Sequence, residues 1–179
     1  THLLHKALKI TLGDHVEQKG SLVSALRTRF DFSHPKALTK DEIAQIETIV
    51  NNEIMKNQAT ETRSMDIAEA QKEGAMMLFG EKYGDKVRVL DIGNSRELCG
   101  GTHVSQTGDI GLFKIQSESG ISSGIRRIEA TTGLNILSML KEQDSLIDHL
   151  SKSLNTNPSE VIAKAEQLIL QIKDNEKLI

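Results

Sequence analysis

The residues that most constrain how this chain can fold are a cysteine and a few histidines that lie far apart in the sequence. Cys99, the only cysteine, and His103 enclose a Gly-Gly-Thr segment, and His2 and His5 stand near the start of the chain. Thiolate and imidazole are ligands that Zn²⁺ prefers, and glycine allows a backbone to turn tightly around an ion. The pattern therefore predicts a zinc site, held by His2, Cys99 and His103, that joins two distant segments.

A second interpretation of these residues is open. A free cysteine often behaves as a small hydrophobic side chain, so Cys99 could be buried and His103 could belong to an ordinary turn. His2 favours the metal interpretation, because it adds a third ligand of suitable chemistry. His5 lies three residues after His2 and thus on nearly the same face of a helix. It is either a further ligand or a histidine at the edge of the core with its ring hydrogen-bonded.

The composition predicts a globular protein without a membrane span. Of the 179 residues, 37% are hydrophobic and 26% are charged, whereas 3% are aromatic, so the core must consist of aliphatic side chains. No apolar run approaches the roughly 20 residues that a membrane span needs, and no signal peptide is visible. A single cysteine fits the reducing cytoplasm. Because the net charge is -3, nucleic acid would have to meet a local basic patch.

Hydrophobic periodicity predicts a domain that mixes helices and strands. Helices are expected at 2–12, 40–56 and 66–73, and strands at 15–18, 25–32, 59–64, 86–92, 110–117 and 125–130. Gly13 ends the first helix, and Thr39 with Glu42 forms a capping box before the second. Alternation along the strand at 25–32 places four side chains on one face: Leu26, Thr28, Phe30 and Phe32.

The chain changes character at Gly133. Leucines and isoleucines at helical spacing predict a long amphipathic helix that ends at Leu154, then a break, and a second helix capped by Ser159. We therefore expect a compact α+β domain over residues 1–132 and a helical hairpin or arm over residues 133–179. An arm with an unpartnered apolar stripe would expose a large patch, which is typical of a dimerisation element.

Two neighbouring arginines near the end of the domain are candidates for binding phosphate. Arg126 and Arg127 lie on a predicted strand, so their side chains point to opposite faces. One can pair with a carboxylate such as Glu129 or Asp91 while the other meets phosphate, and both can equally be ordinary surface charges. The preceding Gly120–Gly124 turn could hold phosphate with its backbone N–H groups, although such turns are common.

The other polar signals in the sequence are weaker. Gln18 precedes residues 19–21, which predict a turn, and on this pattern alone it is a solvated hairpin residue. The sequence contains neither the phosphate loop of nucleotide-binding proteins nor a nucleophile elbow. The metal motif thus remains the main chemical signal.

Six short motifs follow one another along the chain. They are residues 1–5 (THLLH), 18–23 (QKGSLV), 29–32 (RFDF), 78–83 (LFGEKY), 97–103 (ELCGGTH) and 124–129 (GIRRIE). In this order they resemble the editing domain of the alanyl-tRNA synthetase family, and residues 133–179 resemble the segment after that domain. Free-standing alanyl-tRNA editing proteins and the editing domain of threonyl-tRNA synthetases share the metal motifs. The resemblance implies an antiparallel-sheet domain with flanking helices.

The resemblance also implies a ligand set composed of two motifs, HxxxH and CxxxH. Cys99 and His103 match the second motif, and His2 matches the last position of the first. The first histidine of HxxxH would lie four residues before His2, upstream of Thr1, so the chain carries three of the four ligands. The catalytic positions that we expect are Gln18 and Cys99. The positions expected to contact substrate or tRNA are Gly124, Arg126 and Arg127.

The implied activity is hydrolysis of the ester in tRNA(Ala) that carries serine or glycine by mistake. Zinc would organise the pocket and either orient the substrate amine or polarise a water molecule. A metal-bound thiolate is already engaged, which disfavours Cys99 as a covalent nucleophile. ATP and Mg²⁺ would serve only the full-length synthetase, because no part of an ATP site is visible here. The alternative is a non-catalytic, zinc-stapled module that binds tRNA or forms a homodimer through residues 133–179.

Overall fold

The computed structural model describes residues 1–77 and 84–177, which form an α+β structure as the sequence predicts. Contacts divide the chain into two units, residues 1–136 and 137–179, and each is described by itself. The motif at 78–83 lies outside the described residues. Within the described ranges, no helix is both long enough and apolar enough to cross a membrane.

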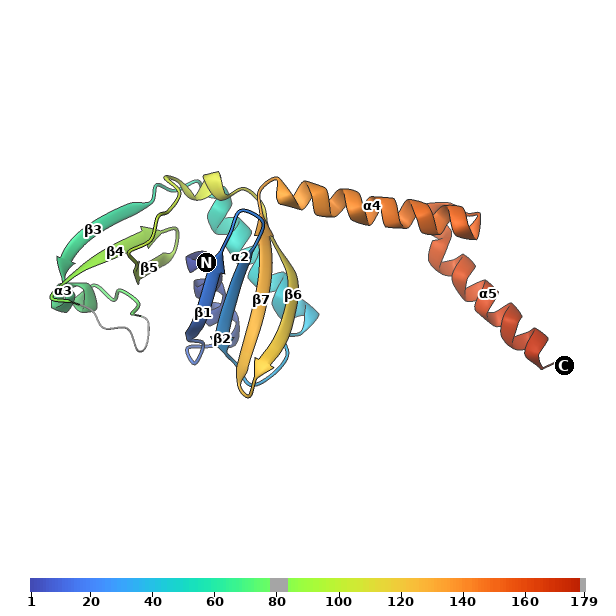
Figure 1. Cartoon of the computed structure of the whole chain (residues 1–179), viewed down its shortest axis with the longest axis horizontal. Helices are drawn as coiled ribbons and strands as arrows, with labels where there is room; N and C mark the ends of the chain where they lie inside the picture. The colour runs from blue at the N-terminus through green and yellow to red at the C-terminus, as the bar shows by residue number, and fades with distance from the viewer. Residues whose placement is uncertain (78–83, 178–179) are drawn as a thin grey trace. The chain divides into compact units, whose positions relative to one another are not determined.

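The larger sheet of the first unit has four antiparallel strands, and two helices pack against it (Figure 1). In spatial order its strands are β1 (Gln18–Val23), β2 (Thr28–Ser33), β7 (Ile125–Thr132) and β6 (Phe113–Ser122). The helices are α1 (His2–Leu12) and α2 (Lys40–Met55). The main core consists of aliphatic and aromatic side chains from these elements, among them Leu4, Leu8, Phe30, Ile46 and Ile128.

Local sequence signals account for the ends of both helices. The Thr39 hydroxyl accepts a hydrogen bond from the N–H of Glu42 at 3.2 Å, and the Glu42 carboxylate accepts one from the N–H of Thr39 at 2.7 Å. The predicted capping box is therefore present at the start of α2. Gly13 ends α1 with a φ of 112°, in the left-handed region that favours glycine.

A smaller antiparallel sheet belongs to the same unit. Its strands, in spatial order, are β3 (Glu61–Asp66), β4 (Lys86–Ile92) and β5 (Ser95–Leu98), and α3 (Ile67–Lys72) follows β3 along the chain. Val87 and Val89 of β4 belong to a small second core, whereas Leu90 and Ile92 belong to the main core. One strand thus serves both cores, and β5, its neighbour in the sheet, contacts α1.

Two strands extend through residues that the sequence predicts as turns. β1 begins at Gln18 and includes residues 19–21, and the hairpin turns at Ser24–Arg27. Residues 119–122 belong to β6, so Ser123 and Gly124 alone connect it to β7. In both places pairing with the neighbouring strand outweighs the turn preference of glycine and serine.

Two further details depend on strand pairing. The sequence pattern did not predict β5, which finds its partner in β4. Phe30 and Phe32 are buried as expected, but Leu26 is 75% exposed. Leu26 lies in the hairpin turn, where the alternation of a strand no longer applies.

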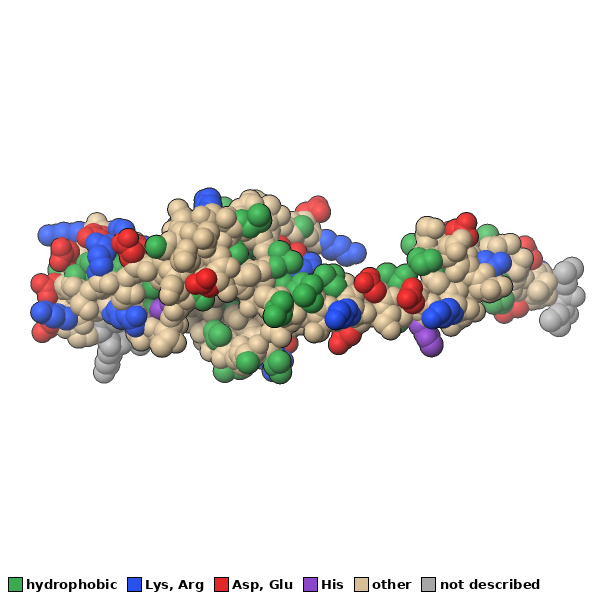
Figure 2. Space-filling view, turned by 90° about the horizontal axis from the view of Figure 1, so that it is seen from above, with side chains coloured by type: hydrophobic (Ala, Val, Ile, Leu, Met, Phe, Trp, Pro, Cys, Tyr) green, Lys and Arg blue, Asp and Glu red, His purple; other side chains and the backbone are tan. Residues whose placement is uncertain are grey.

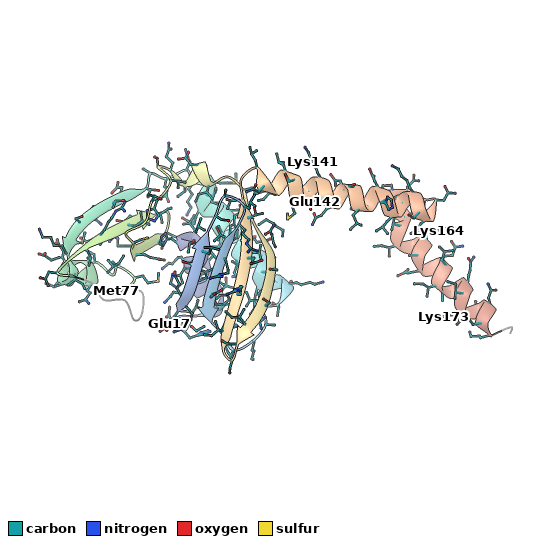
Figure 3. The ribbon with its side chains drawn as sticks, viewed as in Figure 1. Glu17, Met77, Lys141, Glu142, Lys164 and Lys173 are labelled. Atoms are coloured by element: carbon teal, nitrogen blue, oxygen red, sulfur yellow. The ribbon has the colours of Figure 1, made fainter. Side chains whose placement is uncertain are left out.

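The second unit contains most of α4 (Asn135–Leu154), a short 3₁₀ turn at Pro158–Glu160, and α5 (Val161–Glu176). Both helices lie where the sequence predicts them. Ser159 does not cap the second one, because it lies inside the 3₁₀ turn and Glu160 precedes α5 instead. Figure 3 shows four charged side chains that project from these helices: Lys141, Glu142, Lys164 and Lys173.

Candidate metal centre and adjoining pocket

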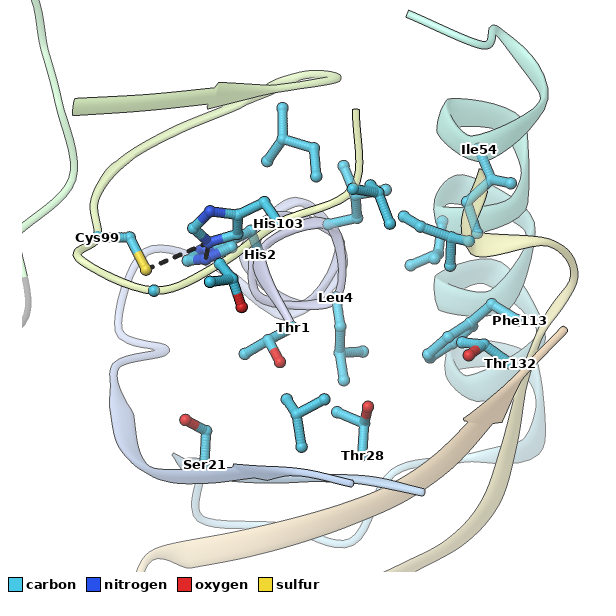
Figure 4. A pocket seen from close by; sticks show the side chains of 18 of the residues that line it. Thr1, His2, Leu4, Ser21, Thr28, Ile54, Cys99, His103, Phe113 and Thr132 are labelled. Atoms are coloured by element: carbon cyan, nitrogen blue, oxygen red, sulfur yellow. Dashed lines mark hydrogen bonds between the residues drawn. The ribbon is translucent and has the colours of Figure 1, made fainter. Parts of the chain in front are cut away.

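Helix α1 and the loop after β5 bring together the three predicted metal ligands. The Nε2 atoms of His2 and His103 lie 3.3 Å apart, and Cys99 Sγ lies 3.4 Å from His103 Nε2. The three ligand atoms lie within 4.8 Å of one another, and each side chain is half-buried. Figure 4 shows these side chains turned toward one another from separate segments. No other such group of His, Cys, Asp and Glu occurs in the part of the chain that the structure describes.

The cluster fits a zinc ion. In a tetrahedral site, Zn–N distances of about 2.0–2.1 Å and Zn–S distances of about 2.3 Å separate neighbouring ligand atoms by about 3.3–3.6 Å. The 3.3 Å and 3.4 Å distances at His103 agree with that range. A Cβ added at Gly101 would lie 3.5 Å from Cys99 Sγ, so the glycine leaves the space beside the thiol open. Burial lowers the pKa of His103, which favours the neutral imidazole that can bind a metal.

A buried carboxylate stands behind His2. Glu97 Oε2 lies 2.6 Å from His2 Nδ1, while Glu97 Oε1 accepts a hydrogen bond from the Ser95 hydroxyl at 2.9 Å and lies 3.3 Å from His5 Nδ1. Burial alone would raise the pKa of Glu97, but the hydrogen bonds and charges of His2 and His5 outweigh burial and bring the pKa down to about 2. Glu97 is therefore ionised and contacts both histidines of α1.

His5 does not join the cluster. The residue is only 2% exposed, and its ring packs against Phe30 with the ring centroids 5.4 Å apart. Its Nδ1 atom faces Glu97 and not the three ligand atoms. The structure thus places His5 in the core, but neither ring nitrogen has a hydrogen-bond partner among the described residues, which differs from the hydrogen-bonded ring that the sequence suggested.

Arg88 of β4 holds the loop that carries the other two ligands. Its guanidinium donates to the carbonyl oxygens of Gly100 at 3.1 Å and Gly101 at 2.7 Å. The N–H of Cys99 donates to the Arg88 carbonyl at 3.1 Å. These bonds fasten to β4 the loop that leads from Cys99 to His103.

A cavity of about 660 Å³ opens beside the three ligands. Its polar lining includes Gln18, Ser21, Thr28 and Thr132 from the larger sheet. Its apolar lining includes Leu4, Val50, Ile54 and Phe113. The labelled members of both groups surround the opening in Figure 4. Apolar walls with a few polar groups are typical of sites for small molecules or small parts of larger ones.

Gln18 is the predicted catalytic position that strand pairing brings to this cavity. It is the first residue of β1, and its Nε2 atom donates to the Ser21 hydroxyl at 3.3 Å. The sequence pattern alone places Gln18 in a solvated hairpin. The extension of β1 through residues 19–21 puts it on the cavity wall instead.

Arg126, Arg127 and Gly124 do not line the cavity. Arg126 donates two hydrogen bonds to the buried carboxylate of Glu118, and Arg127 donates two to Asp31, at 2.7 Å and 2.8 Å. Hydrogen bonds to these carboxylates raise the pKa of both guanidinium groups. Each arginine is thus paired with a carboxylate of the larger sheet and does not contribute to the cavity lining.

The carboxylates suggested as partners for these arginines were wrong. Glu129 pairs with Arg27 at 3.0 Å, and Asp91 pairs with Arg63 and Arg96 of the smaller sheet. The register between β2 and β7 decides the pairing, because it sets Asp31 directly opposite Arg127.

The sequence did not predict a role at the site for two residues, Glu97 and Arg88. Glu97 carried a usable signal, since it stands two residues before Cys99, and alternate residues of an extended backbone share a face. Arg88 carried none, because its contacts depend on how the loop after β5 folds back over β4.

Part of the chain matches a family model for a domain of tRNA synthetases. Residues 87–129 match the family model described as "Threonyl and Alanyl tRNA synthetase second additional domain". This stretch includes the predicted ligands Cys99 and His103 and also Glu97, which contacts His2. The first unit therefore contains a domain found in these synthetases.

Curated relatives match nearly the entire chain. The alanine–tRNA ligases of Polaromonas sp. strain JS666 and Acidovorax sp. strain JS42 are each 58% identical to it, over 100% and 99% of the chain. The alanine–tRNA ligase of Methylobacillus flagellatus is 60% identical over 99% of the chain. In each case the match covers 20% of the relative's length. The chain belongs to the alanyl-tRNA synthetase family and spans about a fifth of the length of the curated relatives it matches.

Proposed function

We propose that residues 1–132 form an editing domain that hydrolyses the ester bond of tRNA(Ala) mischarged with serine or glycine. One observation carries this proposal: a cavity of about 660 Å³ adjoins three converging metal ligands. The identity of 58% to an alanine–tRNA ligase supports tRNA(Ala) as the partner. The ligase reaction, with its ATP and Mg²⁺, would belong to the rest of such a protein, acting in the cytoplasm.

The chemistry explains why an alanine-specific enzyme would need this second site. A pocket that accepts alanine loses only about 1–3 kcal/mol of discrimination when a methyl group is missing, so glycine is poorly rejected. It also rejects the added hydroxyl of serine poorly. A separate hydrolytic pocket supplies the missing selectivity after the wrong amino acid has been attached.

His2, Cys99 and His103 would hold the zinc ion. When bound, zinc would act as a Lewis acid that polarises a water molecule or orients the substrate amine. Zinc sites with three protein ligands and a bound water are typical of catalysis, whereas four protein ligands are typical of a structural role. A metal-bound thiolate is engaged, so Cys99 would serve as a ligand and not as a nucleophile.

The remaining residues of the cavity would bind and orient the substrate. Gln18, held by its hydrogen bond to Ser21, presents an amide to the cavity and can position a polar group of the aminoacyl ester. The apolar wall around Ile54 and Phe113 would limit the access of bulk water to the ester. The polar lining residues would thus orient the ester, and the apolar ones would keep bulk water away from it.

Deacylation of Ser-tRNA(Ala) by the 179-residue chain tests the proposal. We expect the chain to release serine and glycine but to leave Ala-tRNA(Ala) intact. Cys99→Ala should abolish release, and Gln18→Ala should slow it with zinc still bound. Ser145→Ala, on exposed α4, is the control and should behave as the wild type. Decay of Ser-tRNA(Ala) at the same rate with and without the chain would refute the proposal and favour a non-catalytic zinc module.

A second role is favoured by the surface of the helical unit. Figure 2 shows hydrophobic side chains on the surface of this segment among charged ones. Exposed large hydrophobic residues of this unit include Leu137, Leu146, Ile147, Leu150, Ile169, Leu170 and Ile172. An apolar stripe of this kind is typical of an interaction surface. We infer that residues 133–179 form a homodimer contact, and sedimentation as a monomer at high micromolar concentration would contradict this inference.

A further inference from the structure

We propose that Glu97 is a positioning residue that orients the imidazole of His2 for metal binding; this inference rests on the proposed zinc site. Glu97 Oε2 lies 2.6 Å from His2 Nδ1. A carboxylate can only accept a hydrogen bond, so the proton between these atoms belongs to Nδ1. The tautomer of His2 is thereby selected by a residue outside the group of three ligands.

The selected tautomer leaves the other ring nitrogen available. With Nδ1 as the donor, the lone pair of a neutral His2 ring resides on Nε2. His2 Nε2 is the atom that lies 3.3 Å from His103 Nε2 and belongs to the cluster. The arrangement is the one in which a carboxylate raises the basicity of a metal-binding histidine and fixes its ring.

Glu97 is itself held firmly. The residue is 3% exposed, and its Oε1 atom accepts a hydrogen bond from Ser95 at 2.9 Å. The same Oε1 atom lies 3.3 Å from Nδ1 of the buried His5. Both oxygens are thus occupied, and the carboxylate has little freedom to release His2 or to become a ligand.

The backbone links Glu97 to a second ligand. Glu97 stands two residues before Cys99, and the N–H groups between them are bonded: Leu98 donates to Met76 and Cys99 donates to Arg88. Glu97 therefore contacts one proposed ligand, His2, and lies on the strand that leads to another, Cys99. Among the three ligands, His2 is the one with such support, since Nδ1 of His103 has no hydrogen-bond partner among the described residues.

The first experiment measures Zn²⁺ affinity by competition with a chromophoric chelator, on the 179-residue chain. Glu97→Ala should weaken binding about 10–100-fold, the range typical of residues that support a metal ligand. Glu97→Gln, which can still accept a hydrogen bond, should weaken it less. Glu53→Gln is the matched control, because Glu53 is a buried carboxylate of α2, 6% exposed, outside the cluster. It should lower stability but leave Zn²⁺ affinity unchanged.

The second experiment separates orientation from a merely structural role. Nitrogen NMR of labelled imidazoles in the zinc-loaded chain should show His2 protonated at Nδ1 and metal-bound at Nε2. A ring bound through Nδ1, or a Glu97→Ala variant with wild-type affinity, would overturn the proposal. If Glu97→Ala does not fold, Ser95→Ala, which frees one carboxylate oxygen, should give a smaller loss of affinity, and an unchanged affinity would overturn it.

The outcomes also separate this inference from the proposed activity. If the wild type binds no Zn²⁺, the metal site and the role of Glu97 both fail. If the wild type binds Zn²⁺ but does not release serine from Ser-tRNA(Ala), the editing proposal fails while the role of Glu97 stands on the affinity and NMR results.

Discussion

His103 and His149 form a matched pair for testing the metal site, because one lies in the cluster and the other on the exposed surface of α4. We expect His103→Ala to weaken Zn²⁺ binding more than about 100-fold, since losing a ligand costs more than losing a residue that supports one. His149→Ala should leave the affinity unchanged. Chelator competition measures both variants, and equal affinities would exclude His103 as a ligand.

The capping box of α2 allows a test of local helix energetics. Thr39→Ala removes the side-chain acceptor for the N–H of Glu42, and the free energy of unfolding should fall by about 1 kcal/mol. Thr48→Ala on the same helix is the control, because the Thr48 hydroxyl only bonds back to the carbonyl of Ala44. Urea unfolding compares the two, and an equal loss would show that the cap contributes nothing specific.

Strands β2 and β7 are joined by a charge pair whose contribution should depend on pH. The hydrogen bonds from Arg127, together with its charge, outweigh burial and lower the pKa of Asp31. A carboxylate with a lowered folded pKa stabilises the fold fully above its unfolded pKa of about 3.9, and the contribution is lost as pH falls through the folded value.

Asp31→Asn should therefore lower the free energy of unfolding at neutral pH by about 1–3 kcal/mol. The difference from the wild type should shrink as the solution becomes more acidic than about pH 4. Urea unfolding of both proteins across this range provides the measurement. A difference that stays constant down to the acid limit would mean that the charge of Asp31 does not carry the effect.

Metal removal should affect the stability of the whole first unit. The proposed ligands come from α1, which packs in the main core, and from the loop after β5 in the smaller sheet. An ion bound only by the folded chain stabilises it by about 2.7 kcal/mol when free Zn²⁺ is 100 times its dissociation constant. Adding a chelator should therefore lower the thermal midpoint of the wild type. The thermal midpoint of Cys99→Ala should not change on adding the chelator. An unchanged midpoint of the wild type would refute the proposal that zinc links α1 to the loop after β5.

The sequence by itself determined the features that depend on near neighbours. The end of α1 at Gly13, the capping box of α2 and the burial of Phe30 and Phe32 all follow from residues a few positions apart. The Cys99–His103 spacing is local in the same way, and it predicts a metal site without knowledge of the fold. Such signals are readable because helix ends, strand alternation and short metal motifs are local in the chain.

Only the tertiary structure decided which distant groups meet. It placed Glu97 behind His2, paired Arg127 with Asp31, and extended β1 so that Gln18 faces the cavity. These contacts depend on strand register and on how β4 joins the two cores, and neither is encoded in a short window of sequence. A shift of one residue in strand register would turn a carboxylate to the opposite face of the sheet. Its partner is therefore decided by how whole strands and helices pack together.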